Sequence, residues 1–286
     1  MENIVKHLYI KMTNRCNQQC LYCFENCSPT ASPKQLTVAE IKEAIDTIAP
    51  NKTISLTGGE PLLRYDDTIE IMQYALAKNL SVLICTNGTI PIKDWSVFKP
   101  SANRRILFSV SLDGFKDLHE QYRGQGTYDR VLGFSRRALQ NGNTVFVSST
   151  LPLEIYRNQP EYLRRFNNFT RNFGFAENHL SVIRTMGRGK DYPKATLADY
   201  RIMAEHIHAL NDSHAVAGLC VTCQKQKNHA VLDTDGTLKM RCQYLNFPLC
   251  HYKDFTPDSF QQRLQEMDEK KLGYYDGELV TEKEGE

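Results

Sequence analysis

Short β-prone runs alternate with helical patterns along most of the chain. Six runs are rich in apolar and β-branched residues, and helical periodicity falls between them. This alternation is typical of strand–helix–strand units that build a parallel sheet. The expected strands are Ile4–Met12, Thr53–Leu56, Ser81–Cys85, Ile106–Leu112, Thr144–Leu151 and His179–Arg184. The expected helices are Val38–Ala49, Thr68–Lys78, Thr127–Asn141, Glu161–Phe173 and Leu197–Leu210.

The number of units decides between a closed and an open barrel. Six units occupy roughly 190 residues, whereas a closed eight-unit barrel typically needs about 250. We therefore expect an α/β fold, an open partial (β/α)6 barrel, with its active site at the carboxyl ends of the strands. Two local signals mark helix ends: Thr37 and Glu40 have capping-box spacing, and Gly142 directly follows a helical pattern.

The pattern changes from about Gly218 onward. Asp233–Gly236 separates two short β-prone runs, which predicts a β-hairpin around an Asp-Gly turn. A last helix is expected over Pro257–Lys271. We therefore predict two parts, a barrel over residues 1–215 and a small cysteine-rich C-terminal extension over residues 216–286.

Charge and hydropathy exclude several classes of function. The 286 residues carry 35 Lys and Arg against 33 Asp and Glu, a net charge of +2. This balance argues against a nucleic-acid partner held by bulk charge. No apolar run approaches the roughly 20 residues of a membrane span, and the N-terminus lacks the features of a signal peptide. We expect a cytoplasmic protein with no membrane partner.

The nine cysteines form two groups at opposite ends of the sequence. A reducing compartment disfavours disulfides, so two groups of thiols predict two metal or iron–sulfur sites. Cys85 stands alone and is interpreted as a small buried hydrophobe. The N-terminal group is Cys16, Cys20, Cys23 and Cys27, and the C-terminal group is Cys220, Cys223, Cys242 and Cys250.

The first three thiols have the spacing C-x3-C-x2-C and directly follow the first expected strand. Structural zinc sites usually use four ligands, whereas three thiolates on one loop suit a [4Fe–4S] cluster with one open iron. A zinc site with Cys27 as fourth ligand is the alternative. Otherwise Cys27 is a spare loop thiol.

This loop, with Tyr22 before its last cysteine, resembles that of the radical S-adenosylmethionine (radical SAM) family. The resemblance implies that the open iron of a cluster on Cys16, Cys20 and Cys23 binds S-adenosylmethionine. One electron then cleaves this cofactor to a 5′-deoxyadenosyl radical, which abstracts hydrogen from the substrate. A reducing electron donor is therefore implied as a partner. Phe24 resembles the family residue that lies beside the adenine.

Further segments match the family in the same order. Gly58-Gly59-Glu60-Pro61 resembles the GGEP motif, which implies that Glu60 and nearby carbonyls hold the methionyl ammonium. The two glycines allow close backbone approach. At the end of the third expected strand, Thr86 and Asn87 match the family's TNG. At the end of the fourth, Ser111 and Asp113 are implied contacts of the ribose.

Two more segments extend the match, which covers about residues 5–190. His119 to Gly124 resembles the H-x3-R-G of peptide-modifying members, where the arginine pairs with the carboxylate of S-adenosylmethionine. A bidentate guanidinium suits that role, although Arg123 can equally be read as a solvated charge at a helix end. The glycine-rich segment Met186–Gly189 either approaches the adenosine or is an ordinary loop.

The C-terminal thiols resemble the family's auxiliary-cluster extension, called SPASM when long and twitch when short. Twelve residues separate Cys223 from Gly236, as in that pattern, and five separate Gly236 from Cys242, one more than usual. The short remainder after Cys250 implies a single twitch-like [4Fe–4S] cluster. A zinc ribbon on the same four cysteines, Cys220, Cys223, Cys242 and Cys250, is the alternative.

A third arrangement leaves one of these thiols without a cluster. Cys220 and Cys223 both satisfy the spacing to Gly236, so Cys223 is a candidate catalytic hydrogen donor as well as a candidate ligand. We therefore expect a radical SAM enzyme that matures a ribosomal peptide, by epimerisation, a carbon–carbon crosslink or a thioether. The spare thiol favours an epimerase. A small-molecule or nucleoside substrate is the second reading, and a structural zinc protein the third.

Overall fold

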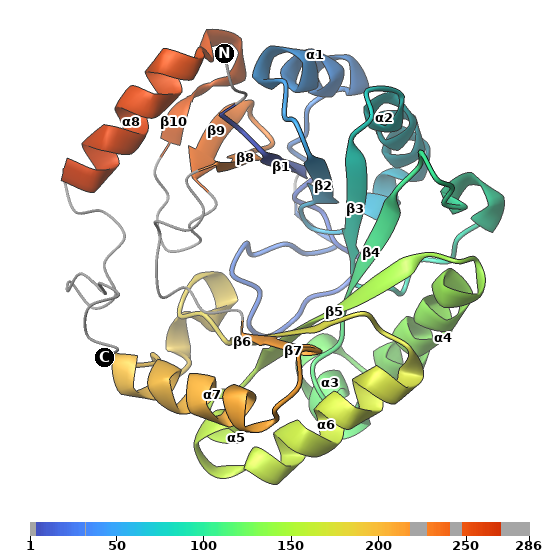
Figure 1. Cartoon of the computed structure of the whole chain (residues 1–286), viewed down its shortest axis with the longest axis vertical. Coiled ribbons are helices and arrows are strands. Elements are labelled where there is room, and N and C mark those ends of the chain that lie inside the picture. The colour runs from blue at the N-terminus through green and yellow to red at the C-terminus, as the bar shows by residue number, and fades with distance from the viewer. Residues whose placement is uncertain (1–3, 32, 218–227, 241–247, 270–286) are drawn as a thin grey trace.

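The computed structural model describes residues 4–31, 33–217, 228–240 and 248–269. Their strands form one ten-stranded sheet in the order β10-β9-β8-β1-β2-β3-β4-β5-β6-β7. Figure 1 shows this sheet as an incomplete ring with the helices on its outer side. The two end strands, β7 and β10, do not pair with each other, so the barrel is open, as the sequence predicts.

Strands β1 to β7 are parallel neighbours, and all six expected strands are confirmed. The sequence did not predict β7 or β10. The strands are β1 His7–Lys11, β2 Thr53–Thr57, β3 Ser81–Thr86, β4 Ile106–Ser111, β5 Thr144–Leu151, β6 Asn178–Val182, β7 Ala215–Ala217, β8 His229–Leu232, β9 Thr237–Met240 and β10 Pro248–His251.

The expected helices are also present. Thr37 caps α1 in a complete capping box with Glu40, and Gly142 after α4 has the positive φ of 87° that favours glycine. Two short helices, α3 and α5, were not predicted because so few residues give no readable period. The helices are α1 Val38–Ile48, α2 Tyr65–Ala77, α3 Lys116–Arg123, α4 Thr127–Gln140, α5 Leu153–Asn158, α6 Pro160–Phe173, α7 Leu197–Ala209 and α8 Pro257–Glu269. None of the described helices is both long and apolar enough to cross a membrane.

The two faces of the sheet differ in chemistry. On β1, Leu8 and Ile10 are fully buried in the core beneath the helices. Successive strand residues point to opposite faces, so His7, Tyr9 and Lys11 lie on the concave inner face and are only half-buried. The inner face of the barrel is therefore the more polar one.

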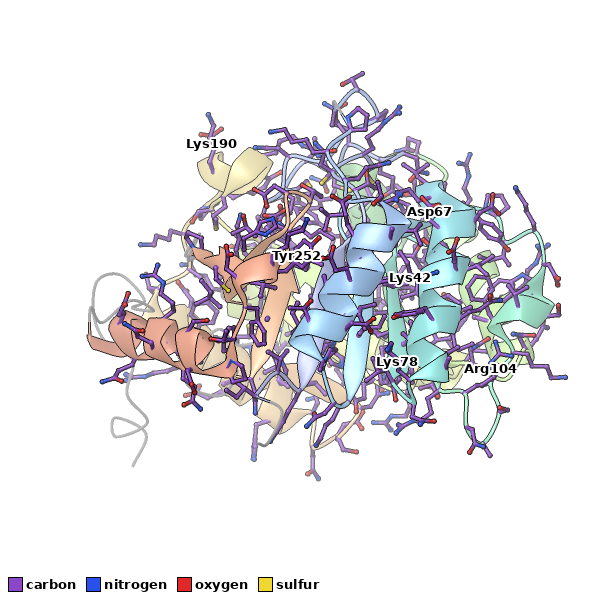
Figure 2. All side chains as sticks on the ribbon, turned by 90° about the horizontal axis from the view of Figure 1, so that it is seen from above. Lys42, Asp67, Lys78, Arg104, Lys190 and Tyr252 are labelled. Atoms are coloured by element: carbon purple, nitrogen blue, oxygen red, sulfur yellow. The ribbon has the colours of Figure 1, made fainter. Side chains whose placement is uncertain are left out.

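The hairpin predicted around Asp233–Gly236 is present as β8 and β9. Gly236 has φ +86°, and a Cβ there would lie 2.4 Å from the His251 ring, so the turn requires glycine. Strand β8 pairs in parallel with β1. Tyr252, which lies beside α1 in Figure 2, donates a hydrogen bond of 2.8 Å to Glu43 of that helix. The described part of the extension thus continues the barrel sheet. The division at residue 215 stays a prediction.

Candidate active site

The family-like segments gather at one edge of the sheet. The cysteine loop follows β1, Gly58-Gly59-Glu60 follows β2, Asn87 follows β3 and Asp113 follows β4. Carboxyl ends of parallel strands meet at the same edge, which is where α/β folds place their sites. The candidate site is built from these strand ends.

Cys16 and Cys20 are buried, and each sulfur lies near nitrogen donors. The Cys16 Sγ accepts from the Gln18 N–H at 3.4 Å and from Asn87 Nδ2 at 3.7 Å. Arg123 Nη1 lies 3.9 Å from the Cys20 Sγ. Burial raises the pKa of Cys16 to about 11 and also raises that of Cys20. Without a metal these two thiols are therefore protonated at neutral pH.

Cys23 and Cys27 of the same loop share a hydrogen bond. A hydrogen bond from Cys27 lowers the pKa of Cys23 to about 6, and the same contact raises that of Cys27. Within the described ranges, no group of three or more His, Cys, Asp or Glu side chains converges as a single metal ion requires. The set still fits a larger cluster, because three thiols share one loop and N–H groups point at two of their sulfurs.

The two glycines after β2 pack against the cysteine loop. Gly58 has φ +122°, and a Cβ there would lie 2.4 Å from the Thr13 carbonyl oxygen. A Cβ on Gly59 would lie 1.9 Å from the Arg15 carbonyl oxygen. The Gly59 and Glu60 N–H groups donate to those same two carbonyls, at 2.7 and 2.9 Å. The two glycines thus permit a close approach between the segment after β2 and the start of the cysteine loop.

Glu60 ties the ends of β2 and β3 together. Its carboxylate is fully buried and accepts from Leu62 N at 3.1 Å, Thr86 Oγ1 at 2.9 Å and Asn87 N at 2.8 Å. Burial raises the pKa of Glu60 to about 7 against these three donors. Glu60 thereby fixes Asn87, whose side chain reaches the Cys16 sulfur. Contact between this carboxylate and an ammonium group stays a prediction.

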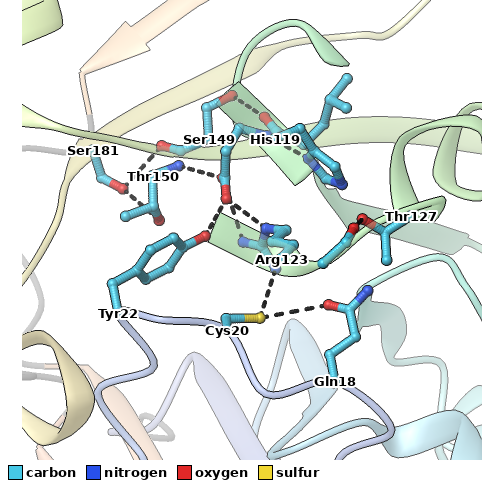
Figure 3. A network of polar contacts seen from close by, with 12 residues as sticks. Gln18, Cys20, Tyr22, His119, Arg123, Thr127, Ser149, Thr150 and Ser181 are labelled. Carbon is cyan, nitrogen blue, oxygen red and sulfur yellow. Dashed lines mark hydrogen bonds and ion pairs between the residues drawn. The ribbon is translucent and has the colours of Figure 1, made fainter. Parts of the chain in front are cut away.

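Asp113 is the centre of a buried network that also contains Tyr22, Arg123 and Thr150, which Figure 3 labels. It accepts from the Arg123 guanidinium, the Tyr22 hydroxyl and the Thr150 N–H, the last at 2.8 Å. The Arg123 guanidinium also lies 5.4 Å from the centroid of the Tyr22 ring. Arg123 is therefore not a solvated charge at a helix end. The fully enclosed Asp113 carboxylate holds the cysteine loop to β4 and α3, and Ser111, half-buried at the same strand end, is the more accessible of the two predicted ribose contacts.

The histidine of H-x3-R-G supports this network from behind. Its Nδ1 accepts from the Asp113 N–H at 3.1 Å, which places the proton on Nε2. Burial lowers the pKa of His119 to about 4, so the ring is neutral at physiological pH. His119 and Arg123 lie four residues apart on one face of α3. One helix face thus fixes both the main chain and the side chain of Asp113.

Several predicted residues lie outside this network. Phe24 is half-buried, with the Arg184 guanidinium 5.2 Å from its ring centroid. Cys250 is half-buried and packs against the apolar core from β10. Cys220, Cys223 and Cys242 lie outside the described residues. The interpretation of Cys85 as a buried hydrophobe is wrong: on β3, Val82 and Ile84 take the core side, so Cys85 lies half-buried on the concave face.

The sequence left Met186–Gly189 open between an adenosine contact and an ordinary loop. The structure places this segment against the cysteine loop, where the Arg188 N–H donates to the Cys23 carbonyl at 3.0 Å. The two glycines around Arg188 were the only sequence signal of this packing.

Fold and site together define a class of protein, an open α/β barrel with a three-thiol loop at the carboxyl ends of its parallel strands. The model of the Radical SAM superfamily matches residues 10–165, more than half of the 286 residues. The chain belongs to this superfamily, which confirms the radical SAM resemblance, whereas the twitch-like extension stays a prediction.

Curated relatives of known name act on different substrates. The chain is 29% identical over 209 residues to an AdoMet-dependent heme synthase of Methanosarcina barkeri, covering 70% of this chain and 57% of that protein. It is 23% identical over 206 residues to the antilisterial bacteriocin subtilosin biosynthesis protein AlbA of Bacillus subtilis, covering 70% and 45%. The chain thus spans about half the length of the curated relatives that it matches.

Solved structures share the fold. The crystal structure of Streptococcus suis SuiB bound to S-adenosylmethionine matches with a TM-score of 0.72 and 14% identity, covering 90% of this chain and 65% of that one. Native anSMEcpe with bound AdoMet matches with a TM-score of 0.66 and 17% identity, covering 91% and 82%.

Proposed function

We propose that this radical SAM enzyme modifies a peptide. Membership of the family implies a [4Fe–4S] cluster and S-adenosylmethionine, which together supply the one-electron cleavage that starts hydrogen abstraction from a substrate. In this chain Cys16, Cys20 and Cys23 would hold the cluster. Asn87 and Arg123, beside two of their sulfurs, would orient what binds there.

The observation that carries the peptide substrate is the chemistry of the concave face. On the described strands, the concave face carries two Lys or Arg side chains, Lys11 and Lys239. Both pair with Asp233, at 3.5 and 2.5 Å. Lys11 also pairs with Glu25 at 2.7 Å. A substrate with several carboxylates needs unpaired cations, because a buried charge requires a partner. Hydroxyl groups, by contrast, can donate to and accept from the amides of an extended peptide. They come from Thr53, Thr57, Ser109, Ser111, Ser148, Thr150 and Ser181.

The names of similar proteins support this reading in part. AlbA is named for the biosynthesis of a bacteriocin, and SuiB has also been solved bound to its precursor peptide SuiA. The second candidate, a small-molecule substrate, is favoured by the heme synthase and by a probable GTP 3′,8-cyclase of Methanocella arvoryzae, 35% identical over 144 residues. The pairing of both lysines on the concave face weighs against the tetrapyrrole version of that candidate.

For the reaction we propose epimerisation at a peptide Cα, with Cys223 as hydrogen donor and an auxiliary [4Fe–4S] cluster on the other three C-terminal thiols, Cys220, Cys242 and Cys250. The substrate loses a hydrogen atom from one face and receives one from the thiol on the other, and the electron donor then reduces the thiyl radical. In deuterated water the thiol carries deuterium, so each turnover adds about 1 Da to the peptide.

The experiment incubates reconstituted enzyme, S-adenosylmethionine, reductant and candidate peptides without oxygen in deuterated water, with mass spectrometry as readout. Cys223→Ala should keep 5′-deoxyadenosine formation and lose deuterium transfer. Cys85→Ala, which removes the half-buried thiol of the concave face, is the matched control and should transfer deuterium normally. Loss of iron together with activity in Cys223→Ala would make Cys223 a ligand instead. Turnover of a nucleoside or tetrapyrrole with no change in any peptide would favour the second candidate.

A further inference from the structure

Arg188 contacts three cysteines of the N-terminal loop through their main chain. Its Nε donates to the Cys20 carbonyl at 2.8 Å and its Nη2 to the Cys27 carbonyl at 2.7 Å. Its own N–H donates to the Cys23 carbonyl at 3.0 Å. Arg188, a single residue in the segment that follows β6, therefore fixes the positions of three cysteines that lie more than 160 positions earlier in the sequence.

The segment around Arg188 is shaped for this contact. Gly187 has φ +56°, and a Cβ there would lie 2.5 Å from the carbonyl oxygens of Cys23 and Phe24. A Cβ on Gly189 would lie 2.1 Å from the Arg184 carbonyl oxygen. Real Cβ atoms do not approach this closely. Glycine at 187 therefore lets this segment meet the cysteine loop, and glycine at 189 lets the segment fold back toward Arg184.

Arg188 also brings a positive charge to the cysteine loop. Within the described residues its side-chain hydrogen bonds go to neutral carbonyls rather than to a carboxylate, so these partners do not neutralise its positive charge. A fixed cation beside thiolates also favours the reduced, more negative form of a cluster that they hold.

We propose that Arg188 is a positioning residue for the iron–sulfur cluster, which holds the cysteine loop in shape before the cluster binds and raises the reduction potential of the bound cluster. The second half of this proposal rests on the assignment of the cluster to Cys16, Cys20 and Cys23. The first half concerns the chain alone.

Two substitutions separate the two roles. Arg188→Gln removes the charge and most of the hydrogen bonds, whereas Arg188→Lys keeps the charge but cannot reach two carbonyls with a planar fork. Lys190→Gln is the matched control, because Lys190 is an exposed cation of the same segment and projects from its short helix in Figure 2.

The first readout is amide hydrogen exchange across residues 16–27 in the cluster-free protein. Exchange should be at least about tenfold faster in Arg188→Gln and in Arg188→Lys, and unchanged in Lys190→Gln. Exchange as slow as in the wild type in both arginine variants would overturn the proposal that Arg188 holds the cysteine loop in shape. This readout needs no cofactor, so it remains decisive if the cluster assignment itself fails.

The second readout is the midpoint potential of the reconstituted cluster, from a titration followed by electron paramagnetic resonance. Arg188→Gln should make reduction about tenfold less favourable, which is 59 mV for one electron. Arg188→Lys should stay near the wild-type potential, as should Lys190→Gln. Equal potentials in wild type and Arg188→Gln would overturn the electrostatic role. Should Arg188→Gln not fold, Arg188→Met takes its place, because its unbranched apolar side chain removes the charge without burying an unpaired amide.

Discussion

The buried carboxylate of Glu60 gives the sharpest prediction on stability. It is fully enclosed, and burial raises its pKa from 4.5 to about 7. A group that binds its proton more tightly in the folded state makes the free energy of unfolding fall as pH rises between those two values. One pKa unit corresponds to 1.36 kcal/mol, so the wild type should lose about 2 to 3 kcal/mol of stability through Glu60 between pH 5 and pH 8.

Glu60→Gln removes this titration. The variant also loses the hydrogen bond from the Asn87 N–H, which an amide NH2 cannot accept, at a cost of about 1–3 kcal/mol. That cost is the same at both pH values, so it cancels from the pH dependence. The assay is urea unfolding of both cluster-free proteins at pH 5 and pH 8. The difference in unfolding free energy, wild type minus variant, should be smaller at pH 8 than at pH 5 by about 2 to 3 kcal/mol. If the unfolding free energies of the wild type and the variant change in parallel with pH, the claim that burial raises the pKa of Glu60 is refuted.

Three further substitutions test the packing of the site. Asp113→Asn breaks the buried pair with Arg123 and should cost about 3–5 kcal/mol in urea unfolding; a cost below about 1 kcal/mol would mean that the pair is solvated. Gly187→Ala forces a Cβ onto two carbonyl oxygens and should lower the melting temperature and the iron bound per chain after reconstitution. Gly133→Ala, in α4 with no atom within 4 Å of the new Cβ, should instead stabilise the fold by about 0.5–1 kcal/mol; equal melting temperatures for the two glycine variants would count against the tight packing at Gly187.

Local patterns predicted the barrel because its strands repeat one signal. Runs such as Thr144–Leu151 alternate in burial, with buried and half-buried residues following each other as period two requires. The parallel pairing of β8 with β1 was not predictable, since it joins residues more than 200 positions apart and nothing in either strand marks its partner. Cys85 was misread for a related reason: its face depends on the strand register and not on its residue type.

Motif order located the candidate site but did not give its electrostatics. Glu60 and Asp113 are recognisable from the sequence, yet only the structure shows each one enclosed by donors from other elements. The spacing of His119 and Arg123 is explained by the structure, in which the Asp113 N–H donates to the Nδ1 of His119 and Arg123 donates to the Asp113 carboxylate. Arg188 had no recognisable role, because the three carbonyls that it contacts belong to a loop at the other end of the barrel sequence.

The central claim is that Cys16, Cys20 and Cys23 hold the cluster through which this radical SAM enzyme works. The most direct measurement reconstitutes the wild type and the triple variant Cys16→Ala, Cys20→Ala, Cys23→Ala without oxygen. It then determines iron and sulfide per chain and the 5′-deoxyadenosine formed from S-adenosylmethionine and reductant. The triple variant should lose about half of the iron, if the C-terminal thiols hold a second cluster, and all of the 5′-deoxyadenosine. Retained 5′-deoxyadenosine formation in the triple variant, or zinc in place of iron in the wild type, would contradict the assignment.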